Sequence, residues 1–113
     1  MITLWHNPRC SKSRQTLALI EARGIDVAVR LYLQDKPDAN ELRLTRDTLG
    51  LRTIDMMRTN ETVFKQLGLT RESSDDDLLA AMAQHPILIE RPILFANSQA
   101  RIGRPPEQVL EIL

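Results

Sequence analysis

The first third of the chain has the pattern of a strand, a loop, a helix and a second strand, and this order constrains the fold more than any other feature. Residues 2–5 form a short apolar run before the turn-forming pair Asn7-Pro8, which predicts a buried strand followed by a loop. Good helix formers occupy residues 11–23, and Gly24 stands where a left-handed helix end is expected.

Apolar and polar residues alternate over residues 25–34, and this period of two predicts a half-buried strand. Two strands joined by a helix normally form a parallel pair with a right-handed crossover. A chain of 113 residues, 42% of them apolar, is long enough for one domain with a sizeable core. We therefore expect a single domain over residues 1–113.

The middle of the chain, about residues 38–85, is predicted to be a helical insertion. Helices are expected over residues 38–49, 53–58, 61–67 and 75–84. Asp38 and Glu41 resemble a capping box, and Gly50 follows the end of the same helix. Ser74 and the three aspartates after it are typical of a helix N-terminus, which explains this acidic run better than a metal site does.

The strand pattern returns near the C-terminus. Residues 93–96 and 100–102 flank the turn-forming pair Asn97-Ser98, which predicts a hairpin, and Pro105-Pro106 opens a final helix that ends at Leu113. The order βαβ, helical insertion, ββα predicts an α/β protein with a thioredoxin-like (glutaredoxin-like) fold and a central helical insertion.

The composition excludes several classes of protein. Fifteen Lys and Arg balance fifteen Asp and Glu, so no global positive field attracts nucleic acid or an anionic membrane. No segment approaches the roughly 20 apolar residues that span a bilayer, and no signal peptide is evident. A single cysteine allows neither an internal disulfide nor a cysteine zinc cluster. We expect a cytoplasmic monomer without a metal.

Cys10, the single cysteine, stands where the first loop meets the first helix. The free amides and the positive end of a helix stabilise an anion, and such cysteines have pKa values lowered from about 8.5 to between roughly 3.5 and 7.5. The neighbouring cations Arg9, Lys12 and Arg14 favour the thiolate further. The alternative is a small buried hydrophobe, which is the common state of a cysteine inside a strand or helix.

The motif around this cysteine is CxxS, with Ser13 where a dithiol enzyme has its second cysteine. No resolving thiol is available within the chain, so a redox cycle at Cys10 requires an external thiol. His6 either tunes or hydrogen-bonds the thiolate or is a solvated loop residue, and the sequence leaves these interpretations open.

Arg58, Arg91 and Arg104 are cations in segments expected to be loops or element ends. Three guanidinium forks offer paired N–H donors that match a tetrahedral oxyanion such as arsenate, phosphate or sulfate. Taken singly, an arginine is more often a solvated surface residue, because it is seldom buried unpaired. Pro92 follows Arg91 at a strand start, and because only about 5–6% of X-Pro bonds are cis, frequency alone predicts a trans bond.

Five segments of the chain resemble the glutaredoxin-coupled arsenate reductase (ArsC) family, closest to its short, YfgD-like members. They are residues 6–14 (HNPRCSKSR), 57–58 (MR), 85–86 (HP), 90–93 (ERPI) and 101–105 (RIGRP). The resemblance covers essentially the whole chain. It implies that Cys10 is the nucleophile, that His6, Ser13 and Arg14 support its thiolate, that Arg58, Arg91 and Arg104 bind the oxyanion, and that the bond before Pro92 is cis.

The same resemblance implies an activity, namely reduction of arsenate to arsenite through a covalent intermediate between Cys10 and arsenic. Glutathione would be the co-substrate and glutaredoxin the protein partner, with no bound cofactor. Two alternatives remain: a glutathione-dependent thiol-disulfide oxidoreductase without physiological arsenate activity, and an Spx-like transcription regulator. A phosphatase-like arsenate reductase is excluded, because its Cx5R loop would need arginine where Thr16 stands.

Overall fold

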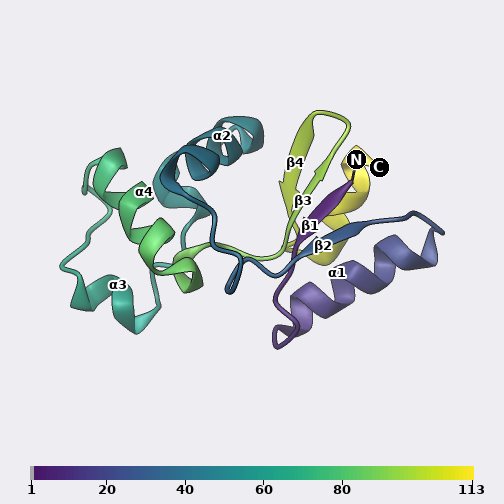
Figure 1. The fold of residues 1–113 in the computed structure, drawn as a ribbon, viewed down its shortest axis with the longest axis horizontal. Coiled ribbons are helices and arrows are strands. Elements are labelled where there is room, and N and C mark those ends of the chain that lie inside the picture. Colours follow the sequence, from purple (N-terminus) through teal and green to yellow (C-terminus); the bar gives the residue numbers. More distant parts are fainter. Residues whose placement is uncertain (1) are drawn as a thin grey trace. The chain divides into compact units, whose positions relative to one another are not determined.

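The computed structural model describes residues 2–113. The chain divides into two compact units (Figure 1). The sheet unit contains the described residues up to Asp35 together with Arg91–Leu113, and the helical unit contains Lys36–Glu90. The helical insertion therefore extends a few residues beyond the predicted range at both ends.

The sheet unit is built on four strands with the order β2-β1-β3-β4. Their bounds are β1 Thr3–Trp5, β2 Ala28–Arg30, β3 Ile93–Ala96 and β4 Gln99–Ile102. β1 and β2 are parallel, whereas the β1–β3 and β3–β4 pairs are antiparallel. This arrangement confirms the thioredoxin-like plan, with the βαβ half and the ββα half joined in one sheet through β1 and β3.

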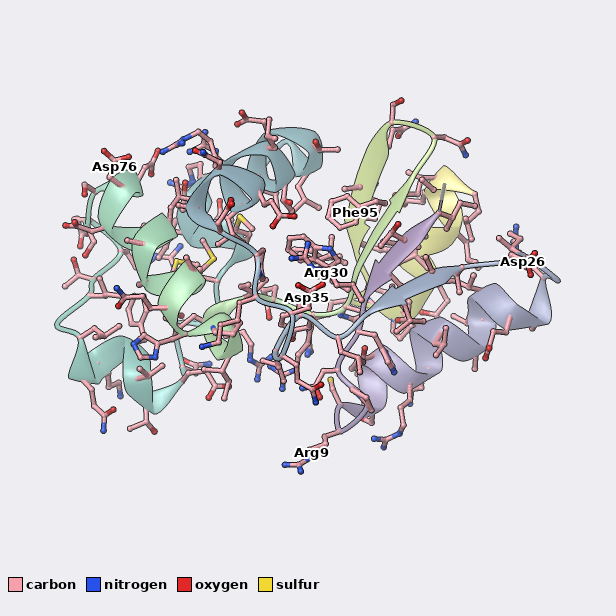
Figure 2. The ribbon with its side chains drawn as sticks, in the orientation of Figure 1. Arg9, Asp26, Arg30, Asp35, Asp76 and Phe95 are labelled. Atoms are coloured by element: carbon pink, nitrogen blue, oxygen red, sulfur yellow. The ribbon has the colours of Figure 1, made fainter. Side chains whose placement is uncertain are left out.

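One face of the sheet carries three aromatic rings. Trp5 packs against Phe95 with 5.0 Å between ring centroids and stacks on Tyr32 at 6.4 Å. The Arg30 guanidinium lies 5.2 Å from the Trp5 ring centroid, and its Nε is 3.2 Å from a carboxylate oxygen of Asp35 (Figure 2). This cation–π contact and ion pair fix the chain where it leaves β2.

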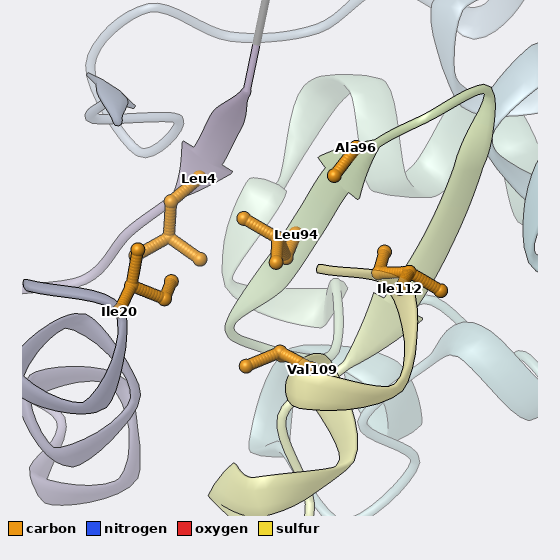
Figure 3. Packing of buried hydrophobic residues seen from close by; sticks show 6 residues of the cluster. All are labelled: Leu4, Ile20, Leu94, Ala96, Val109 and Ile112. Carbon is orange, nitrogen blue, oxygen red and sulfur yellow. The ribbon is translucent and has the colours of Figure 1, made fainter. Parts of the chain in front are cut away.

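The opposite face is covered by α1 (Ser11–Ala22) and the 3₁₀ helix η3 (Pro106–Ile112). The hydrophobic core between them contains Leu4, Ile20, Leu94, Ala96, Val109 and Ile112, all buried (Figure 3). Leu4 and Leu94 are register partners on β1 and β3, so they point to the same side of the sheet. Burying such side chains contributes about 1.5–3 kcal/mol each, and this attaches α1 firmly to the strand that precedes it.

The predicted half-buried strand over residues 25–34 is too long, and its alternation holds only at Ile25 and Val27, which pack against the core. Only Ala28–Arg30 is strand, Val29 is 45% exposed, and Leu31 is 37% exposed. Because β2 is an edge strand and the chain turns at once, with Leu31 accepting bonds from the N–H groups of Gln34 and Asp35, the alternation is broken. Tyr32 takes the buried position instead.

The helical unit contains α2 (Ala39–Leu49), η1 (Thr53–Met56), α3 (Thr62–Gln66), α4 (Asp75–Gln84) and η2 (Pro86–Leu88). The predicted capping box is present: the Asp38 carboxylate accepts a bond from the Glu41 N–H at 2.8 Å, and Gly50 ends α2 with a φ of 71°. Ser74 caps α4 by accepting from the Asp77 N–H at 3.1 Å. These helix starts and stops are confirmed, whereas η2 was not predicted.

The hairpin between β3 and β4 turns at Asn97 and Ser98, both with positive φ, as the two-residue turn predicted. The final helix begins at Pro106 but is a 3₁₀ helix. Just after β4, the Gly103 N–H donates to the Pro92 carbonyl at 2.9 Å. A Cβ at Gly103 would lie 2.6 Å from Thr16 Oγ1 and 2.8 Å from Pro92 Cγ.

We predict that Gly103→Ala lowers the free energy of unfolding by about 1–3 kcal/mol, because the added methyl group overpacks this junction. Urea unfolding measures the effect. Thr16→Ala removes the nearest of the clashing atoms, so Gly103→Ala should lower the free energy of unfolding by less in the Thr16→Ala variant than in the wild type. Equal costs in both backgrounds would contradict this origin of the effect.

Candidate functional site

Cys10 is the N-cap residue of α1, with extended backbone angles and a partly exposed side chain. Its N–H donates to the Asn7 carbonyl at 3.0 Å, and its own carbonyl accepts from the Arg14 N–H at 3.0 Å. The loop is therefore closed by one turn before the helix begins, and the sulfur stands at the end of the helix where backbone N–H groups are unpaired.

The surroundings of Cys10 favour the thiolate. Burial raises the pKa of the thiol, but hydrogen bonds from the backbone N–H groups of Ser13 and Lys12 and from the Arg91 side chain lower it, together with the Arg91 charge. The net pKa lies below that of an ordinary cysteine. The interpretation of Cys10 as an inert buried hydrophobe is therefore wrong.

Two arginines contact the sulfur from the segments that flank the hairpin. Arg91 hydrogen-bonds to Cys10, and Arg104 Nη2 lies 3.9 Å from Cys10 Sγ while Arg104 Nε donates to the Arg91 carbonyl at 3.0 Å. The Arg91–Pro92 bond is cis, and so is Arg104–Pro105. The resemblance implied the first of these bonds, and nothing in the sequence indicated the second.

Arg91 also carries two buried donors, Nε and Nη1, that have no hydrogen-bond partner among residues 2–113. A buried donor left unpaired costs about 1–3 kcal/mol, so such groups are rare unless something else completes them. An oxyanion placed on this guanidinium would accept from both. The site thus combines a sulfur of lowered pKa with buried donors that have no partner among residues 2–113.

His6 and Ser13 form a buried pair on the loop side of the cysteine. His6 Nδ1 lies 2.6 Å from Ser13 Oγ, and Ser13 Oγ also accepts from the Asn7 N–H at 3.0 Å. The solvated interpretation of His6 is wrong, since the residue is only 6% exposed. Burial and the Arg14 charge lower the pKa of His6 against the opposing effect of Glu21, so the ring is neutral at pH 7.

Ser13 therefore supports the site both through its backbone and through its side chain, two roles that the CxxS motif alone does not separate. Its backbone N–H faces the sulfur, whereas its hydroxyl holds the loop through His6 and Asn7. Arg14 also acts on the loop, because its Nη1 donates to the Pro8 carbonyl at 2.8 Å. These contacts fix the path of the four residues that precede Cys10.

Arg58, the third arginine of the expected oxyanion set, belongs to the helical unit. Its Nε is 3.0 Å from Glu61 Oε1, its Nη1 is 3.4 Å from Glu90 Oε1, and its N–H donates to the Leu88 carbonyl at 2.7 Å. The guanidinium is thus held by two carboxylates within its own unit, which the sequence analysis did not predict.

Neither a metal centre nor a membrane segment is found in the part of the chain that the structure describes. Residues 2–113 contain no group of three or more His, Cys, Asp or Glu side chains placed to hold a metal ion. The helices within the same range are too short or too polar to cross a membrane.

The fold and the site together define a thioredoxin-like protein with one activated cysteine. Residues 5–112 match the model of the ArsC family, and the chain belongs to that family. The Escherichia coli protein YfgD, described as uncharacterized, is 48% identical over 99% of this chain and 96% of its own length. A protein of Haemophilus influenzae named arsenate reductase is 46% identical over 99% of this chain and 98% of its own length.

Solved structures agree with this assignment. The arsenate reductase from Vibrio cholerae is 54% identical to this chain and superposes with a TM-score of 0.96, covering 99% of this chain and 97% of that one. An ArsC-related protein from Bacteroides fragilis, at 22% identity and a TM-score of 0.85, shares the fold.

We predict that alkylation of Cys10 by iodoacetamide becomes half-maximal at a pH below the pKa of an ordinary cysteine, because only the thiolate reacts. Arg91→Ala should move this midpoint upward, since it removes a hydrogen bond and a positive charge from the sulfur. Arg101→Ala is the matched control, as Arg101 pairs with Glu111. An unchanged midpoint in Arg91→Ala would refute the assigned role.

Ser13→Ala is expected to lower the free energy of unfolding by about 1–3 kcal/mol, because it leaves the buried His6 ring and the Asn7 N–H without their partner. The backbone N–H of residue 13 remains, so the alkylation midpoint should move less than in Arg91→Ala. Ser11→Ala, at the exposed start of α1, should stay within about 0.5 kcal/mol of wild type. Urea unfolding and the pH profile of alkylation decide both points.

Proposed function

We propose that this protein is an arsenate reductase in which Cys10 is the nucleophile. The observation that carries the proposal is the pair of buried, unpartnered Arg91 donors beside a sulfur with a lowered pKa. The names of close relatives over the full length of the chain give independent support. We expect the enzyme to act as a cytoplasmic monomer with no bound cofactor.

In the first step, the Cys10 thiolate attacks arsenic(V). A sulfur–arsenic bond forms, one arsenic–oxygen bond breaks, and the oxygen leaves as water after protonation. Arg91 and Arg104 would hold the remaining oxygens and offset the negative charge that develops on them. Arg58, whose guanidinium pairs with Glu61 and Glu90, is the third residue that we propose as an oxyanion ligand.

The reduction itself needs thiols from outside, because Cys10 has no partner cysteine in the chain. Glutathione would replace a second oxygen of arsenic, again with loss of water. A glutaredoxin thiolate would then attack the glutathione sulfur, and the electron pair of the sulfur–arsenic bond would stay on arsenic, which becomes trivalent. Hydrolysis of the remaining bond releases arsenite and returns the Cys10 thiol, while glutaredoxin carries away the mixed disulfide.

The two alternative functions are less well supported. A thiol-disulfide oxidoreductase needs the activated sulfur but gives no reason for two buried anion donors beside it. An Spx-like regulator with a redox switch needs a second cysteine at the position of Ser13. The anion-binding geometry therefore favours arsenate over both alternatives.

The test is NADPH oxidation coupled to arsenate through glutathione, glutaredoxin and glutathione reductase. Wild type should turn over, Cys10→Ser should fall to background, and Arg91→Ala should lose about 10²–10³ in kcat/KM for arsenate. Arg101→Ala serves as the control for loss of an arginine. No turnover by wild type would overturn the function, and an active Cys10→Ser variant would overturn the mechanism.

A further inference from the structure

We propose that a cavity beside the Cys10 loop binds the reducing thiol, a short peptide thiol bearing carboxylates, of which glutathione is the type. The cavity, called here the thiol pocket, has a volume of about 220 Å³. It is lined by His6, Asn7, Pro8, Arg9, Leu31, Leu33 and Gln34. This assignment rests on the proposed function and locates a substrate within it.

The thiol pocket lies beyond the carboxyl ends of two neighbouring parallel strands. Asn7–Arg9 follow β1, and Leu31–Gln34 follow β2, and the two strands are parallel neighbours. The carboxyl ends of parallel strands form a crevice in open α/β sheets, and ligands collect there. Both walls of the pocket belong to the sheet unit.

The pocket is next to the sulfur but separate from the anion donors. Its first wall, residues 7–9, ends one residue before Cys10, whose N–H donates to the Asn7 carbonyl. Arg91 and Arg104 do not line it. A thiol in the pocket would therefore reach an adduct on Cys10 without displacing the oxyanion from its arginines.

The lining matches the chemistry of a peptide thiol. Pro8, Leu31 and Leu33 supply apolar walls for methylene groups, and the amides of Asn7 and Gln34 suit a peptide backbone. The volume is below the roughly 300–1,000 Å³ of pockets that enclose drug-sized ligands, so it would hold part of a tripeptide and leave the rest in solvent.

The charge around the pocket favours an anionic ligand. Arg9 extends outward from the loop (Figure 2), and its guanidinium pairs with no carboxylate among residues 2–113. The sheet unit carries eight Arg and Lys against five Asp and Glu, a net charge of +3. A thiol with two carboxylates is therefore attracted to this loop, whereas a neutral thiol is not.

The test uses a reaction of Cys10 that needs no arsenate: the thiolate attacks a disulfide, a mixed disulfide forms, and one thiolate leaves. Two probes are compared, glutathione disulfide and the neutral hydroxyethyl disulfide, and the ratio of their rate constants is the readout. Using the ratio cancels any change in the thiolate fraction of Cys10.

Gln34→Glu places a carboxylate in the pocket without changing its shape and should lower the ratio by about three- to tenfold. Arg9→Ala should lower it in the same direction. Gln99→Glu makes the same substitution on β4, at the opposite edge of the sheet, and should leave the ratio unchanged.

An unchanged ratio in both pocket variants would overturn the assignment of the pocket. If wild type reduces arsenate in that case, the proposed function stands without it. If wild type fails to reduce arsenate while the pocket variants lower the ratio, the function is wrong and the thiol pocket stands.

Discussion

The site depends on one electrostatic constraint: a partly buried thiolate must be stabilised by groups whose positions are fixed. The first turn of α1 supplies this through the backbone N–H groups of Lys12 and Ser13, which are fixed by the helix itself. Because Ser13 also holds the preceding loop through its buried hydroxyl, the direction of the sulfur and its ionisation are set by the same residue. A change that loosens the start of α1 would therefore disturb both.

The guanidinium groups reach the sulfur because α1 and the hairpin strands are packed unusually closely at one point. Gly103 follows β4, donates to the Pro92 carbonyl, and leaves no room for a side chain against Thr16 on α1. That junction brings the residues just before β3 and just after β4 to the first turns of the helix. Arg91 and Arg104 are these residues, and the contact from Arg104 to the Arg91 carbonyl joins them.

Much of the fold follows from local signals in the sequence. Asp38 with Glu41, Ser74 and Gly50 mark helix ends because each satisfies backbone groups within a few residues, and such signals are readable without tertiary structure. The predicted strand after α1 is too long, because the chain turns at Leu31 and buries Tyr32 against the Trp5 ring, a contact that no local pattern indicates. The site likewise combines local and non-local features. The position of Cys10 at a helix start is local and was predictable. The unpartnered donors of Arg91 and the cis bond before Pro105 follow from no local pattern.

The single cysteine has a consequence for how the protein relates to its surroundings. A dithiol enzyme stores two electrons when reduced and can complete one reaction before it meets a reductant, whereas one thiol stores no such pair. In the proposed reaction, Cys10 would bond to the substrate without being able to finish the reduction, so every cycle would draw its electrons from the surrounding thiol pool while the substrate is still attached. Activity would then follow the state of that pool immediately, with no reserve to bridge a period of oxidation.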